Sequence, residues 1–162
     1  MSVRYLLFWL VTCIVFGLDR STKVWAESHL SLGESVVGIP GWFEWSLYHN
    51  PGAAGGLFSG YVGVLILISL AAVVGILLYV YKGAHDRNLC LLTGLGLLLG
   101  GALGNLYDRI VYHHVIDFIN PIDATYIYNI ADKGIRWGLY LSLIGLWLAR
   151  RRVAKHNQNM VS

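Results

Sequence analysis

Charged residues are scarce in this 162-residue sequence. Only 13% of its residues are charged, whereas about 25% are charged in an ordinary soluble domain. Hydrophobic residues make up 56% of the chain, which is the composition of an integral membrane protein. The net charge of +3 is small, and the basic residues lie at the ends of apolar segments. We therefore expect no nucleic-acid partner.

The sequence also lacks the usual signs of disulfides, metal centres and hydrolase triads. Its two cysteines, Cys13 and Cys90, lie in separate apolar segments and predict no disulfide framework. There is no HExxH motif, and no Cys/His cluster has the spacing of a zinc site. No serine occupies a strand–turn–helix elbow, so a serine hydrolase is not indicated. The sequence predicts neither a metal nor a cofactor.

Long hydrophobic runs dominate what is present. The run over 62–81 has no charge across about 20 residues, enough to span about 30 Å of hydrocarbon as a helix. Because the first run continues past Cys13 and three more follow, it predicts a membrane helix and not a cleaved leader. We expect an all-α membrane protein, a four-transmembrane-helix bundle forming one integral membrane domain over 1–162. The helices are expected at about 5–25, 62–81, 89–106 and 127–149.

A polar and aromatic connection, residues 26–60, separates the first two predicted helices. Residues 36–39 and 42–47 have strand character and flank a Pro40-Gly41 turn, which predicts a small β-hairpin cradle on the bilayer surface. The connection contains no Lys or Arg, so it is expected outside the cytoplasm. Both termini are then cytoplasmic.

Helix order predicts that polar side chains from distant segments meet at the outer membrane face. Ionisable groups at the edge of hydrocarbon are costly, so each is a functional-site candidate. Asp19 and Lys23 share one helix face; they would suit this site or an ion pair that reaches the headgroups. Asp123 is expected in a solvated turn. The converging residues are Asp19, Lys23, Asn50, Asn105, Asp108, Arg109, Asn129 and Asp132.

Carboxylates in such a cluster suit two kinds of chemistry. Two close carboxylates cannot both ionise cheaply, so they share a proton. The ionised one can take a proton from water while the protonated one hydrogen-bonds a scissile carbonyl, as in aspartic peptide hydrolysis. The same groups could carry protons or cations through a transporter. A transporter usually shows an internal repeat, and none is found here. In a third alternative the carboxylates take part in no reaction and form a structural ion pair with Arg109 or Lys133.

Five sequence blocks, in order, resemble the signal peptidase II family (peptidase family A8), the bacterial lipoprotein signal peptidases. The resemblance covers nearly the whole chain. Each block alone is a weak signal, and the five together in this order are a strong one. The blocks are DRSTK at 19–23, NPGAA at 50–54, GGALGNLYDR at 100–109, VIDF at 115–118 and YNIAD at 128–132.

The resemblance implies an intramembrane aspartic endopeptidase whose catalytic pair is Asp117 and Asp132. It implies cleavage of prolipoproteins just before a cysteine that carries a diacylglyceryl group, without a metal. The implied partners are this prolipoprotein and membrane lipids, and globomycin-type cyclic peptides are the implied inhibitors. The protein is expected to be a monomer. The implied location is the bacterial cytoplasmic (inner) membrane. Supporting positions implied by the resemblance are Asp19, Lys23, Asn50, Gly104, Asn105, Asp108, Arg109, Asn129 and Ala131.

Two positions depart from the family pattern. Gly55-Gly56 stands where an aromatic residue usually follows the NPGAA block, and Lys133 stands where a small residue usually follows Asp132. These departures raise the alternative of an inactive relative that binds lipidated peptide without cleaving it. Retention of all five blocks and of both aspartates favours the active enzyme.

Overall fold

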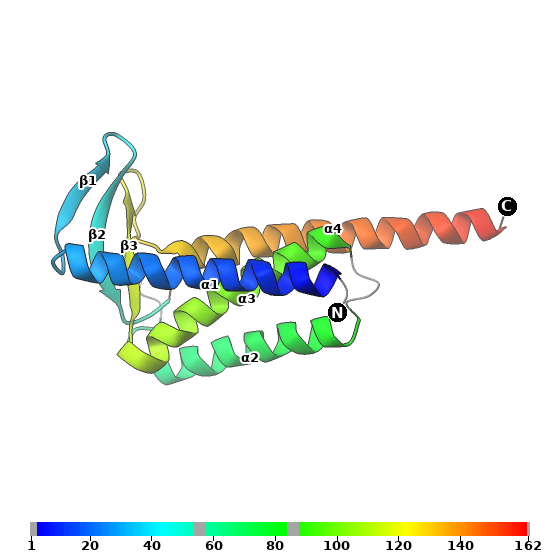
Figure 1. Cartoon of the computed structure of the whole chain (residues 1–162), viewed down its shortest axis with the longest axis horizontal. Coiled ribbons are helices and arrows are strands. Elements are labelled where there is room, and N and C mark those ends of the chain that lie inside the picture. The colour runs from blue at the N-terminus through cyan, green and yellow to red at the C-terminus, as the bar shows by residue number, and fades with distance from the viewer. Residues whose placement is uncertain (1–2, 54–57, 84–87, 162) are drawn as a thin grey trace.

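Four helices and a small sheet make up the described part of the chain. The computed structural model describes residues 3–53, 58–83 and 88–161, with side chains as far as Arg152. Gly55 and Gly56 lie outside the described residues. The expected fold class is confirmed (Figure 1). The elements are α1 (Val3–His29), β1 (Ser35–Ile39), β2 (Phe43–Asn50), α2 (Val62–Tyr81), α3 (Leu89–Tyr112), β3 (Val115–Pro121) and α4 (Ile130–Val161).

Length and apolar composition identify two of the helices as candidate membrane spans. Among the described residues, α2 and α3 are long and apolar enough to cross a bilayer, with mean hydropathies of 2.8 and 1.8. Helix α2 leaves large apolar side chains uncovered: Leu67 is 67% exposed and Ile68 is 56% exposed. An apolar surface of this kind requires an apolar environment, which lipid supplies.

Polar residues decide where the helices end. Helix α3 continues to Tyr112, beyond the expected end near residue 106, and stops where His113 takes a left-handed conformation with φ of 62°. Helix α4 begins at Ile130, after the expected start at 127, because the Asn129 side chain accepts a hydrogen bond from the backbone N–H of Asp132 (2.9 Å). Asn105 and Asp108 therefore lie inside α3, near its C-terminal end, and Asp132 lies in the first turn of α4.

Glycines let α3 pack closely against its neighbours. A Cβ on Gly138 of α4 would lie 2.6 Å from the backbone nitrogen of Leu98 in α3. A Cβ on Gly100 of α3 would lie 2.8 Å from the carbonyl oxygen of Thr12 in α1. Such distances are shorter than real Cβ contacts allow, so only glycine permits this approach of backbones. The close packing holds the outer ends of α1, α3 and α4 together.

The sheet has one strand more than the sequence predicted. The expected hairpin is present as β1 and β2, but the residues between the third and fourth helices, where the sequence predicted no strand, contain β3. The strands are antiparallel in the order β1-β2-β3, and Tyr48 pairs with Asp117 in register. Strand β3 is stabilised by Ile116 and Phe118, which pack with Leu47 beneath the end of α1. Figure 1 shows the sheet beside the C-terminal end of α1 and the start of α4.

Candidate active site

Asn105 lies at the junction of three helices. Its side-chain oxygen accepts hydrogen bonds from the Lys23 ammonium (3.0 Å) and the Asn129 amide (3.1 Å). Its own amide donates to Oδ1 of Asp132 (2.8 Å). Lys23 belongs to α1, Asn105 to α3 and Asp132 to α4. The convergence expected from helix order is therefore present as direct hydrogen bonds.

Asp117 is held on β3 by two amides. Its Oδ1 accepts from the side-chain nitrogen of Asn129 (2.7 Å), and its Oδ2 accepts from that of Asn50 (2.9 Å). The residue is only 1% exposed. Burial, together with the nearby charge of Asp132, raises the pKa of Asp117 to about 7. This carboxyl group therefore exchanges its proton near neutral pH.

Asp132 occupies the first turn of α4. Its Oδ2 accepts from the backbone N–H of Asn129 (3.4 Å), while the Asn129 side chain accepts from the backbone N–H of Asp132 (2.9 Å). This reciprocal pair has the geometry of a capping box, with an acid in the third helical position. The helix dipole stabilises negative charge at this end of the helix. The capping box and the helix end therefore fix the Asp132 carboxylate at the start of α4, and burial beside it favours the protonated form of Asp117.

Both aspartates line one pocket of about 220 Å³. Arg109 also lines it; one guanidinium nitrogen donates to the Gly52 carbonyl (3.3 Å) and another to the Asn105 carbonyl (3.5 Å). The buried Nε of Arg109 has no hydrogen-bond partner among the described residues. The remaining lining residues are Asn50, Ala53, Asn105, Val115, Tyr126, Ile127, Tyr128, Lys133, Ile135 and Arg136.

A buried charge network lies beneath this pocket. The Lys23 ammonium is 2.8 Å from Oδ2 of Asp19 and 2.7 Å from Oδ2 of Asp108, and all three side chains are fully buried. Arg20 pairs with the other oxygen of Asp108. The alternative in which Asp19 and Lys23 reach the headgroups as an interfacial pair is therefore wrong. Helix packing places α3 and α4 over both side chains.

Each buried aspartate of this network holds the backbone next to one pocket aspartate. Oδ2 of Asp108 accepts from the N–H of Ile116, the residue before Asp117 (3.2 Å). Oδ1 of Asp19 accepts from the N–H of Ala131, the residue before Asp132 (2.9 Å). The network thus sets the position of both pocket carboxylates. Asp108 also pairs with Lys23 and Arg20, which join it to α1.

Small residues are required where the network meets α4. A Cβ on Gly104 would collide with the Asp19 carboxylate and would lie 3.3 Å from Cβ of Ala131. Ala131 itself is fully buried. A side chain at Gly104 would therefore displace the carboxylate that holds the first turn of α4.

The two basic residues expected as ion-pair partners of the pocket aspartates do not pair with them. In the described part of the chain, neither Arg109 nor Lys133 forms an ion pair with Asp117 or Asp132. The Lys133 ammonium instead lies over the Tyr128 ring, 3.8 Å from its centroid. Asp123 lies in an exposed turn, as expected.

Arg20 was not singled out from the sequence as a site residue. It supports the network through Asp108, and its guanidinium also lies over the Tyr107 ring, 4.4 Å from the centroid. Its place beside Asp19 in the DRSTK block is the one sequence signal that could have found it.

The chain is similar to known proteins in sequence and in fold. The family model described as signal peptidase (SPase) II matches residues 11–148. A lipoprotein signal peptidase of Gloeobacter violaceus is 41% identical, covering 90% of this chain and 84% of the relative. One from Desulfitobacterium hafniense is 37% identical, covering 93% and 99%. A solved structure described as a bacterial membrane enzyme superposes with a TM-score of 0.79 at 31% identity, covering 85% of each chain.

Proposed function

Because the chain belongs to the signal peptidase II family of aspartic peptidases, we propose that Asp117 and Asp132 are its catalytic pair. Its activity is that of a lipoprotein signal peptidase, which processes prolipoproteins. The proposal rests on one observation above all: Asp117 and Asp132 line the same pocket, and burial beside Asp132 raises the pKa of Asp117 to about 7. That is the arrangement an aspartic peptidase needs at neutral pH.

The two carboxyl groups divide the chemistry between them. Asp132, ionised at the start of α4, takes a proton from a water molecule as the hydroxyl oxygen adds to the scissile carbonyl carbon. Asp117, protonated, donates its proton to the carbonyl oxygen and so removes the charge that develops there. Proton transfer from Asp132 to the amide nitrogen then lets the C–N bond break, and Asp117 recovers its proton as the new carboxyl group forms.

Substrate binding follows from the donors and grooves around this pair. The guanidinium of Arg109, which lines the pocket, donates to a carbonyl of the bound peptide. A second groove, of about 180 Å³, shares Asn105, Arg109 and Ile135 with the catalytic pocket. It is otherwise lined mainly by apolar residues of α2 and α3, including Ile68 and Leu98. This groove suits the acyl chains of a diacylglyceryl cysteine, which places the scissile bond beside Asp117 and Asp132.

The proposal includes an arrangement in the membrane. All four helices, in one domain of residues 1–162, cross the bacterial cytoplasmic membrane with both termini in the cytoplasm. The pocket opens at the outer face, where the sheet presents Trp42, 76% exposed, at the depth of the headgroups. The protein acts as a monomer, and globomycin-type cyclic peptides occupy the same pocket.

Substrate choice tests the function. The purified protein in detergent should cleave a diacylglyceryl-modified prolipoprotein and leave the unmodified form of the same prolipoprotein intact. The acyl groove explains the difference, because only the lipidated cysteine anchors the peptide at the pocket. Gel mobility after timed incubation measures both reactions. Equal cleavage of the two forms would show that lipid recognition is absent.

The pH dependence tests the assignment of the acid. Since the pKa of Asp117 is raised to about 7, its proton is present below that pH and lost above it. We expect kcat/KM to fall about tenfold per pH unit well above pH 7, because both carboxylates are then ionised. The free energy of unfolding should also decrease as pH rises through about 7, because the folded protein then loses the proton that it binds more tightly than the unfolded chain does. A rate that stays constant to about pH 9 would contradict the role of Asp117 as the acid.

A further inference from the structure

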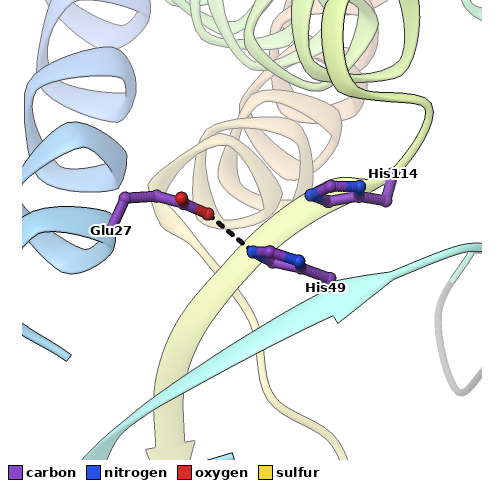
Figure 2. A group of neighbouring side chains, drawn as sticks. All are labelled: Glu27, His49 and His114. Carbon is purple, nitrogen blue, oxygen red and sulfur yellow. Dashed lines mark hydrogen bonds and ion pairs between the residues drawn. The ribbon is translucent and has the colours of Figure 1, made fainter. Parts of the chain in front are cut away.

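Three metal-binding side chains from distant parts of the chain meet outside the catalytic pocket. Glu27 lies near the end of α1, His49 lies on β2, and His114 lies between α3 and β3. Figure 2 shows the two imidazole rings side by side, with Glu27 facing His49. Nε2 of His49 is 2.7 Å from Oε1 of Glu27, and the two rings stack with centroids 4.0 Å apart.

The chemistry and the spacing of these atoms suit a transition-metal ion. One ligand atom from each residue lies within 4.8 Å of the other two. A tetrahedral zinc ion, about 2.0–2.2 Å from each nitrogen or oxygen ligand, places its ligands roughly 3.3 Å apart. Rotation of the imidazole and carboxylate groups closes this difference, and such terminal torsions are soft. Two imidazoles and a carboxylate form a donor set that zinc uses with a water molecule as fourth ligand.

We propose that Glu27, His49 and His114 form a binding site for a divalent transition-metal ion such as Zn²⁺, which fastens the end of α1 to the sheet. All three side chains are accessible from solvent: Glu27 is exposed, and His49 and His114 are partly exposed. Ions can therefore enter and leave without opening the helix bundle. As far as the chain is described, the residues lining the catalytic pocket include none of the three. The metal is thus separate from peptide hydrolysis.

The position of this site gives the ion a mechanical role. His49 pairs in register with Ile116 of β3, and the next residue, Asn50, donates to the Asp117 carboxylate (2.9 Å). His114 stands three residues before Asp117 on the same segment. An ion held by these ligands ties α1 to both strands that carry the surroundings of Asp117. Hard oxygen-seeking cations such as Mg²⁺ are not expected to bind two imidazoles.

Sequence spacing could not have found this site. Recognisable zinc motifs place their ligands a few residues apart, whereas these three stand at positions 27, 49 and 114. The absence of a metal motif predicted no metal, and the tertiary fold alone brings the ligands together. The proposal replaces the expectation of no metal at this one site. Peptide hydrolysis is still expected to need no metal.

Calorimetric titration tests the proposal directly. The full-length protein, purified in detergent with any histidine tag removed, is titrated with zinc chloride and, separately, with magnesium chloride. We expect one zinc ion per chain and no magnesium binding. Glu27→Gln, His49→Gln and His114→Gln should each weaken zinc binding by about tenfold or more, because each removes one ligand. The matched control is His29→Gln, since His29 is an exposed histidine on the same helix as Glu27 that contacts Trp25.

Thermal unfolding gives a second readout that is independent of cleavage. Zinc should raise the unfolding midpoint of the wild-type protein and of His29→Gln by several degrees, and should leave the three ligand variants unshifted. Comparing each variant with and without zinc cancels any effect of the substitution on the fold itself. The proposal is overturned if the wild type binds no zinc, or if the ligand variants bind it as tightly as the wild type. Failure of this test leaves the peptidase assignment untouched, because neither readout uses the catalytic reaction.

Discussion

Asp117→Asn and Asp132→Asn should each reduce cleavage of lipidated prolipoprotein by about a thousandfold or more. An amide at position 117 cannot release a proton to the carbonyl oxygen, and an amide at position 132 cannot take one from water. Both substitutions keep the size of the side chain, so the pocket is preserved. Gel-shift cleavage assays in detergent, with enzyme in excess for the variants, measure the loss.

Asp123→Asn is the matched control for these substitutions. It makes the same chemical change in an exposed turn and should retain wild-type activity. Thermal unfolding of all three variants separates lost chemistry from lost structure. Near-normal cleavage by a folded Asp117→Asn or Asp132→Asn protein would disprove the catalytic pair.

Lys23→Met should lower the stability of the fold by about 3–5 kcal/mol, because it leaves a buried carboxylate without its cation. The Lys23 ammonium is the fully buried partner of both Asp19 and Asp108, and Arg20 can compensate only Asp108. For a chain of this size the unfolding midpoint should fall by about 10 °C. Methionine fills a similar volume, so the loss reports the missing charge more than a cavity. Unfolding in detergent, followed by tryptophan fluorescence, gives the midpoint.

Two further variants sharpen this test. Lys133→Met removes an ammonium that lies over the Tyr128 ring, and should cost less than about 1 kcal/mol. Lys23→Met combined with Asp19→Asn should recover part of the lost stability, because it removes the uncompensated charge together with its partner. A single Lys23→Met variant with an unchanged midpoint would show that the network is not needed for stability.

Local features of the sequence were enough to predict the helices and the hairpin. The length of each apolar run predicts a helix, and the Pro40-Gly41 turn between two β-prone segments predicts β1 and β2. These patterns depend on neighbouring residues only, so they can be recognised without the fold. Helix order then predicted that Asn105 and Asp132 would meet, and they form a direct hydrogen bond.

The membership of β3 in the sheet could not be predicted in this way. Its residues join β2 through pairs such as Tyr48 with Asp117, which are far apart in the sequence. The gain from such pairing depends on how the whole chain closes, and local propensity does not contain that information. The sequence therefore predicted no strand in this segment.

The sequence by itself determined which groups could do chemistry: the number of carboxylates, their order along the chain and, for Asp19, Asp108 and Asp132, the helix that carries each one. Only the tertiary structure decided their state. Asp117 gains its raised pKa from burial beside Asp132, and Asp19 with Lys23 is buried by packing of α3 and α4. The charge that a group prefers depends on its exposure to solvent and on the charges and hydrogen-bond donors around it. Here residues far apart in the sequence form that environment: the Asp19 carboxylate, for example, accepts a hydrogen bond from the backbone N–H of Ala131.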